Sequence, residues 1–375
     1  MAPTIFLAMQ HLHPTQGMSS WATRGLLLLL PFVIAGLALG LRLQGVDWDG
    51  GNFYHPDERS IYLRAEQMYR TLTDAPGWEA GANRDFPLDT PGIPSVRTLL
   101  DKDTSPLNPH WFPLGTIIIY MLVGVRFLLD PFMDQVRLQD LASAGRTMAA
   151  IADAGSVLAM YFLGRRLFGT SVGLLSSTLL ALSVINIQTT HFYRPESFII
   201  LLALASFWWM LNVVQHFRLR DHLILGLIIG LTFAFRSSSL PILAPLVLTY
   251  GWRLWRRWPP PASVEPRLSA VAPLIRQMFY AGGISLITFA VLQPYAILDF
   301  GKFVGDLSWE AGIARTAGKV PYTIQYVDTT RTGLYELRQS ALWALGLPLG
   351  IIAWAGLAIA IVVAFTRPKI ADLLL

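Results

Sequence analysis

Two short segments of this chain repeat one arrangement of aromatic, proline and acidic residues. Residues 52–58 read Asn-Phe-Tyr-His-Pro-Asp-Glu, and residues 191–197 read His-Phe-Tyr-Arg-Pro-Glu-Ser. We call them the twin segments. Each lies beside a strongly apolar stretch, where carboxylates are costly to desolvate and usually persist for function. Together they could form one polar site from two loops. Proline followed by acids is also typical of turns and helix starts, and this simpler reading stays open.

The adjacent acids of the first twin segment are suited to acid–base chemistry. A carboxylate that reaches a hydroxyl can act as its general base. Of two neighbours, one can face the reacting centre while the other orients a nearby group or tunes its pKa. We therefore expect Asp57 and Glu58 to be catalytic residues. The alternative is that both acids complement the positive end of a helix that begins after Pro56.

Further polar residues are candidates for substrate binding. Arg236 interrupts an apolar stretch, where a guanidinium suits either a lipid phosphate or a salt bridge to a loop acid. The other expected binding residues are His55, His110, His191, Arg194, Glu196, Asp299 and Tyr326, with Asn108, Lys302, Tyr322, Gln325 and Asp328 nearby. The carboxylates of Asp57, Glu58 and Glu196 are also candidate ligands for a divalent metal ion. No tight ligand spacing supports a metal, so no cofactor is assigned.

The composition indicates an integral membrane protein. Of the 375 residues, 53% are hydrophobic and only 14% are charged, whereas soluble domains carry about 25% charged residues. The chain has no cysteine, which excludes disulfides, thiolate zinc sites and cysteine nucleophiles. The net charge of +5 comes from basic clusters at the ends of apolar runs. Such clusters favour a role in membrane topology over nucleic-acid binding.

Eight apolar runs are candidates for transmembrane helices. They cover residues 25–41, 147–163, 171–187, 198–214, 223–235, 239–252, 278–293 and 341–365. Basic clusters at 165–166, 218–220, 253–257 and 367–369 lie at alternate ends of these runs. The positive-inside rule places all four clusters in the cytoplasm.

A ninth run, residues 114–129, is interpreted as a juxtamembrane helix. It contains Arg126, and a crossing here would put the twin segments on opposite faces of the membrane. We therefore predict an all-α polytopic membrane protein with about eight transmembrane helices. Residues 1–375 form one membrane-embedded domain in this prediction. Its extracytoplasmic loops cover about 43–145, which contains juxtamembrane helices, 188–197 and 294–340.

With this topology, the chain resembles the glycosyltransferase C superfamily. It looks closest to the polyprenyl-phosphate-dependent enzymes related to protein O-mannosyltransferases. The matching motifs are His55-Pro56-Asp57-Glu58, Asn108-Pro109-His110, residues 164–169, residues 191–197 and residues 294–299. They extend over about residues 45–340. None of these motifs is specific to the family by itself. The resemblance rests on their order along the chain and on the membrane face predicted for each.

The resemblance implies a mannosyl- or other hexosyltransferase that inverts the sugar on the extracytoplasmic face. The donor would be a sugar on polyprenyl or dolichyl phosphate, and the acceptor a hydroxyl of a protein, lipid or glycan. It assigns the general base to Asp57 and the departing phosphate to Arg236 and Arg194. Glu58 and Glu196 would orient the acceptor or hold a metal. A multi-pass location is implied, in the cell membrane if the source is prokaryotic.

One feature departs from the family pattern. Relatives often carry further spans or a C-terminal domain, whereas this chain ends soon after its eighth run. A missing C-terminal extension that specifies the acceptor therefore stays open.

The alternative function is a membrane transporter or lipid flippase with Asp57 and Glu196 as coupling carboxylates. Transporter carboxylates tend to lie near the bilayer midplane on broken helices of repeated halves. Here they lie in predicted loops with aromatic neighbours, and no internal repeat accompanies the twin segments. A non-enzymatic scaffold would leave the clustered acids unexplained. The sequence favours the enzyme.

Overall fold

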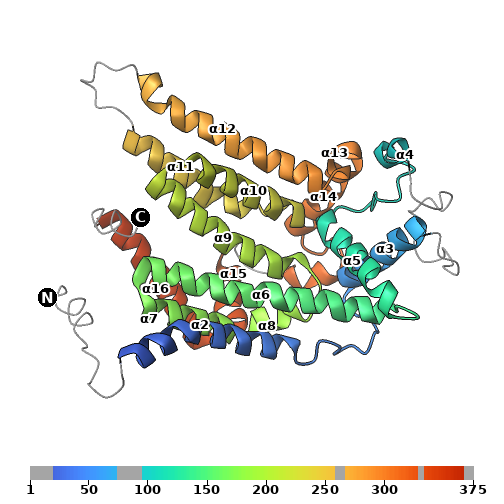
Figure 1. Cartoon of the computed structure of the whole chain (residues 1–375), viewed down its shortest axis with the longest axis horizontal. Coiled ribbons are helices and arrows are strands. Elements are labelled where there is room, and N and C mark those ends of the chain that lie inside the picture. Colours follow the sequence, from blue (N-terminus) through green and yellow to red (C-terminus); the bar gives the residue numbers. More distant parts are fainter. Residues whose placement is uncertain (1–19, 74–94, 258–266, 328–332, 367–375) are drawn as a thin grey trace.

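The computed structural model describes residues 20–73, 95–257, 267–327 and 333–366, and within them all regular secondary structure is helical. Each predicted apolar run falls on a helical segment. The long helices lie side by side as a layered bundle (Figure 1). They are α2 (Ser20–Leu43), α6 (Leu138–Phe168), α9 (Pro195–His216), α10 (Leu219–Phe235), α11 (Leu243–Arg257), α12 (Arg267–Leu292) and α16 (Leu347–Thr366). Helix α9 packs between α6 and α10, and α10 packs in turn on α12.

Three helices of the described residues are long and apolar enough to cross a bilayer, namely α6, α9 and the part of α12 from Val271 to Leu292. A fourth span results if α7 (Thr170–Ala181) and α8 (Val184–Thr190) are counted together, since they meet at a bend of 54°. The apolar parts of α2 and α16 are shorter. The all-helical, membrane-type fold is therefore confirmed, while the count of eight spans stays a prediction.

Several of the shorter helices gather at one end of the bundle, which we call the site end. Here lie α3 (Pro56–Thr73), α4 (Val96–Leu100), α5 (Thr116–Leu129), α13 (Tyr295–Leu298) and α14 (Phe300–Arg315), on the right of Figure 1. Helix α5 covers the run that was interpreted as juxtamembrane. Its 14 residues extend over about 21 Å, less than the hydrocarbon core of about 30 Å. Its length suits a helix that lies at the membrane edge.

The charge inside α5 is neutralised within the protein. Arg126 donates to Glu66 of α3 at 3.0 Å and to Asp130 at 2.7 Å. Its guanidinium also lies 4.0 Å from the centre of the Tyr69 ring. A buried guanidinium requires such partners, so Arg126 fastens α5 onto α3.

Close backbone contacts fix the helices around the site end. The Gly115 N–H, just before α5, donates to the carbonyl of Phe235 at the end of α10, at 2.9 Å. A Cβ atom on Gly115 would lie 1.8 Å from the carbonyl oxygen of Ala234. Only glycine allows this approach, which holds the start of α5 against the segment that leads into Arg236.

Candidate functional site

The twin segments face each other at the site end. Arg194 Nη2 lies 3.6 Å from the carboxylate of Asp57. The ring of Phe192 packs edge-on against His55, with centroids 5.0 Å apart. Helices α3 and α9 each begin at the proline of their twin segment. The segments are thus helix starts, as the simpler reading expected, and they also meet in one polar group.

Asp57 presents its carboxylate toward the surface. Its side chain is 39% exposed, and its backbone N–H faces His55 Nδ1 at 3.2 Å. The contact with Arg194 is longer than a direct hydrogen bond. The carboxylate is accessible to a hydroxyl group that approaches from outside the protein.

Glu58 has the opposite environment and is fully buried. Arg146 donates to both carboxylate oxygens at 2.9 Å, and the Tyr193 N–H donates at 2.7 Å. The Tyr62 hydroxyl donates as well. These donors occupy the carboxylate and hold it away from the surface. The geometry gives Glu58 an anchoring position, and its expected part in catalysis stays a prediction.

Arg146 is a central residue that the sequence reasoning missed. This fully buried side chain of α6 also binds Asp49 through both terminal nitrogens, at 3.0 and 2.7 Å. Hydrogen bonds from Arg146 hold the pKa of Asp49 below its usual value. One guanidinium thereby fastens the loop before α3 and the first turn of α3 to α6. The available signal was a basic residue at the predicted outer end of an apolar run, where the positive-inside rule disfavours it.

Two arginines share one carboxylate beside Asp57, and we call Arg194 and Arg236 the arginine pair. Glu196 Oε1 accepts from Arg194 at 2.9 Å and from Arg236. Arg236 also donates to Ser238 at 3.1 Å. The second oxygen of Glu196 is buried without a hydrogen-bond partner among the described residues. With Asp57 beside Arg194, the two arginines face two carboxylates, and their guanidinium groups are donors of the kind that bind phosphate.

Two further titratable groups border Asp57. Burial, and then the charge of Arg194, lower the pKa of His55. Burial, and then the charge of the nearby Asp57, raise the pKa of Glu310 in α14. The side chain of Glu310 was not singled out from the sequence. It brings another carboxylate to the edge of the site.

Two predicted binding residues form a separate group. Asn108 donates to Asp299 at 3.1 Å, and His110 Nδ1 lies 3.6 Å from the same carboxylate. This group joins the loop before α5 to the start of α14. Its contacts are structural ones between loops, and they do not include the arginine pair.

The remaining predicted binding residues have structural contacts. The ring nitrogens of His191 lie 2.7 Å from the carbonyl of Ile187 and 2.8 Å from that of Gln44, so His191 ties α8 to the end of α2. The ring of Tyr326 packs edge-on against Tyr335. The neighbouring candidate Asp328 and the side chains of Tyr322 and Gln325 lie outside the described residues.

The carboxylates of the site are turned toward arginines. Within the described ranges no three His, Asp or Glu side chains group as metal ligands. Of the candidate ligands, Glu58 binds Arg146 and Glu196 binds the arginine pair. Two of the three candidate ligands are thus bound by arginines, and we assign no step to a metal.

An apolar groove leads from Arg236 of the arginine pair along α9. Its first part, of about 620 Å³, has Glu196, Arg236 and Ser238 at one end and apolar side chains of α8, α9 and α11 along its length. Its second part, of about 700 Å³, continues between α6, α9 and α11. Phe207 and Pro245 line both parts. We call the two together the α9 groove.

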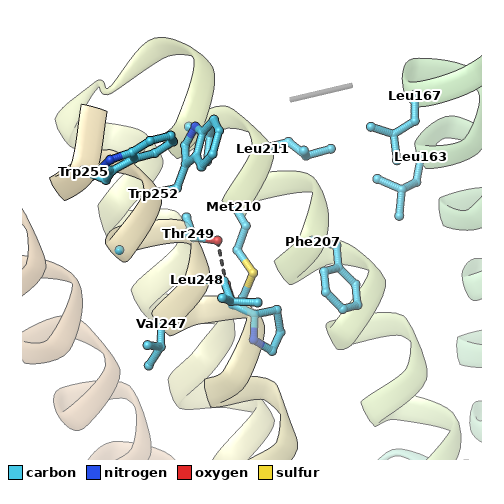
Figure 2. A pocket seen from close by; sticks show the side chains of 13 residues that line it. Leu163, Leu167, Phe207, Met210, Leu211, Val247, Leu248, Thr249, Trp252 and Trp255 are labelled. Carbon is cyan, nitrogen blue, oxygen red and sulfur yellow. Dashed lines mark hydrogen bonds between the residues drawn. The ribbon is translucent and has the colours of Figure 1, made fainter. Parts of the chain in front are cut away.

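The second part of the groove is almost wholly apolar. Figure 2 shows Leu163 and Leu167 of α6 on one side, Trp252 and Trp255 of α11 on the other, and side chains of α9 between them. From Glu196 to Val214 the groove follows α9 for about 27 Å at 1.5 Å per residue. This length is close to the thickness of a bilayer core. A polar end followed by a long apolar channel fits a lipid with an anionic head group.

A comparison with known families is consistent with this arrangement. Residues 136–272 match the model of the dolichyl-phosphate-mannose-protein mannosyltransferase family. The resemblance expected from the sequence is thereby confirmed over that segment. The match includes Arg146, the second twin segment, the arginine pair and most of the α9 groove, and it leaves Asp57 outside. It supports a mannosyltransferase-like membrane glycosyltransferase that uses a lipid-phosphate sugar. No curated protein matches the chain.

Proposed function

We propose that this protein transfers a sugar from a polyprenyl or dolichyl phosphate to an acceptor hydroxyl on the extracytoplasmic face, with inversion. The observation that carries the proposal is the α9 groove, which ends at Glu196 and Arg236. Glu196 links Arg236 to Arg194, and Arg194 lies beside Asp57. A lipid tail, a phosphate and a reacting carbon would then occupy consecutive positions. The family match supports the donor class.

The arginine pair binds the donor phosphate in this proposal. Arginine forms short, charge-assisted hydrogen bonds to phosphate oxygens, and Glu196 keeps the two guanidinium groups side by side. Since the leaving phosphate gains charge during transfer, these cations stabilise the transition state more than the ground state.

Asp57 acts as the general base. Its carboxylate takes the proton of the acceptor hydroxyl as that oxygen attacks the anomeric carbon. The new C–O bond forms on the face opposite the phosphate, and the bond from the anomeric carbon to the phosphate oxygen breaks. The lipid phosphate leaves with the electron pair, and the sugar is inverted.

Glu58 and Arg146 position the base. Their buried ion pair fixes the first turn of α3 to α6, and Asp57 is the preceding residue in that turn. A base held by a rigid helix start keeps the short distances that proton transfer requires. Asp57 in turn orients the acceptor hydroxyl. Glu58 contributes by holding the backbone of this helical turn, and with it Asp57, in place.

The transporter alternative is less well supported. Asp57 and Glu196 lie at one end of the bundle, beside arginines. Coupling carboxylates of transporters lie near the bilayer midplane. The α9 groove is apolar beyond its polar end, which suits a lipid tail better than an ion path.

The test is sugar transfer by purified protein from a panel of polyprenyl-phosphate sugars. We expect Asp57→Asn to lower turnover by about 10²–10⁴-fold, as for loss of a general base, while donor binding is retained. Asp47→Asn is the matched control, because Asp47 is an exposed acid of the preceding loop that binds Gln139. Unchanged turnover in Asp57→Asn would overturn the assigned base. If the wild type turns over none of these donors, the proposed glycosyltransferase activity is wrong.

A further inference from the structure

An exposed group of aromatic side chains lies beside Asp57, and we call Trp48, Tyr54 and Phe192 the aromatic shelf. Trp48 is 44% exposed and Tyr54 is 68% exposed. The ring centroid of Trp48 lies 6.0 Å from that of Tyr54 and 5.5 Å from that of Phe192. Phe192 in turn contacts His55. The shelf is therefore continuous with the polar site.

The shelf is held in place by polar contacts beneath it. The indole N–H of Trp48 donates to the carbonyl of His191 at 3.0 Å. The next residue, Asp49, is bound by Arg146 through two hydrogen bonds. Consecutive turns of the loop before α3 are closed by backbone hydrogen bonds such as that from Trp48 N–H to Gly45. A rigid, exposed aromatic surface marks a place that another molecule covers.

The position of the shelf assigns it to the acceptor. A chain of contacts leads from Arg236 through Glu196 and Arg194 to Asp57 and His55, and from His55 to the shelf. A general base lies beside the acceptor hydroxyl, within hydrogen-bond distance of the proton that it takes. With the donor phosphate at the arginine pair, His55 separates the shelf from the donor, and the shelf is left to the acceptor.

We propose that the aromatic shelf binds a pyranose ring of a carbohydrate acceptor and presents its hydroxyl to Asp57. This proposal rests on the proposed function. A sugar ring has an apolar C–H face that packs on aromatic rings, while its hydroxyl groups hydrogen-bond at the rim. The rim here offers the carboxylate of Asp57 and the hydroxyl of Tyr54. This combination suits a sugar better than a serine or threonine side chain, which has no comparable apolar face.

The first test is binding, which needs no donor. Wild-type protein in phosphatidylcholine nanodiscs is mixed with neutral trisaccharides, and saturation-transfer NMR measures contact with the sugar ring protons. Sugar-headed detergents are avoided because they would compete. We expect Tyr54→Ser, a change at a highly exposed side chain, to reduce the transfer signal by about 3–10-fold, the range of one aromatic contact. Trp343→Ala, at another highly exposed aromatic residue, is the control and should keep the signal.

The second test separates acceptor from donor. In transfer assays, Tyr54→Ser and Trp48→Phe should raise the KM of the trisaccharide by about 3–10-fold and leave the KM of the polyprenyl-phosphate sugar unchanged. An increase confined to the donor KM would overturn the assignment to the acceptor. If wild-type protein transfers sugar only to peptides that carry a hydroxyl group, the proposal of a carbohydrate acceptor is wrong, while the proposed glycosyltransferase activity is supported.

The NMR test also decides the proposal if the enzyme assay fails. Trisaccharide binding that Tyr54→Ser weakens supports the shelf even without donor turnover. Equal signals in wild type, Tyr54→Ser and Trp48→Phe would overturn it and indicate an aromatic belt at the membrane interface.

Discussion

Adjacent acids of the first twin segment have opposite environments because successive residues of a helix point about 100° apart. Glu58 is directed into the bundle toward Arg146, and Asp57 is directed outward. The sequence predicted that one acid would react while the other supports it. The resemblance gave the part of the base to Asp57, but the physical reason, which is how α3 packs on α6, requires the structure.

Burial of His55 predicts a dependence of stability on pH. Its lowered pKa means that the unfolded chain, with a value near 6.5, takes up a proton at a higher pH than the folded protein. Stability should therefore fall as pH drops through about 6.5. The variant His55→Asn has no imidazole to protonate and therefore lacks this loss. We expect the Tm of the wild type minus the Tm of the variant to decrease from pH 7.5 to pH 5.5.

The thermal shift is measured in identical nanodiscs across that range. Ser60→Ala, a nearby change that removes no titratable group, gives the background. An increase of this Tm difference at low pH would contradict the expectation. It would show that the charges of Asp57 and Glu58 stabilise the protonated imidazole of His55.

Arg146 shows why part of the site escapes sequence reasoning. Apolar runs reveal helices because their pattern is local. A buried ion pair between residues 88 positions apart depends on which helices pack together, and no local pattern encodes it. The sequence singled out Arg194, Arg236 and Glu196 and left open a salt bridge from Arg236 to a loop acid, but it did not indicate that both arginines bind the same carboxylate.

At the scale of elements, the contact between α5 and α10 positions Arg236. We expect Gly115→Ala to destabilise the protein by about 1–3 kcal/mol, the usual cost of overpacking, because its Cβ would meet a backbone carbonyl. The Cβ of Gly124→Ala, inside α5, meets no atom within 4 Å, and this variant should stabilise the protein by about 0.5–1 kcal/mol. Thermal unfolding of both variants checks this, and equal Tm values would refute the close contact.

Helix positions were the most predictable part of the fold. The apolar runs found α6, α9 and α12, and the break between 171 and 187 was missed because a bend in an apolar segment leaves its composition unchanged. The juxtamembrane reading of α5 came from charge sidedness. Its length and its ion pairs to α3 support that reading, but its orientation in a membrane stays a prediction.

For the whole molecule, the account requires both twin segments on one membrane face and the far end of the α9 groove on the other. The chain has no native cysteine, so single cysteines at the exposed positions Tyr54, Ser238 and Trp255 are direct probes. An impermeant maleimide should label positions 54 and 238 from the same face and position 255 from the opposite one. Labelling of 54 and 238 from opposite faces would make the shared site untenable.

The central claim is that the donor phosphate binds at the arginine pair, next to Asp57, with its lipid tail in the α9 groove. The most direct test is an experimental structure of the purified protein with bound polyprenyl monophosphate. We predict phosphate oxygens at about 2.7–2.9 Å from Arg194 and Arg236, and isoprenoid density along α9 toward Trp252. A phosphate at the opposite end of the groove, beside Trp255, would contradict the account.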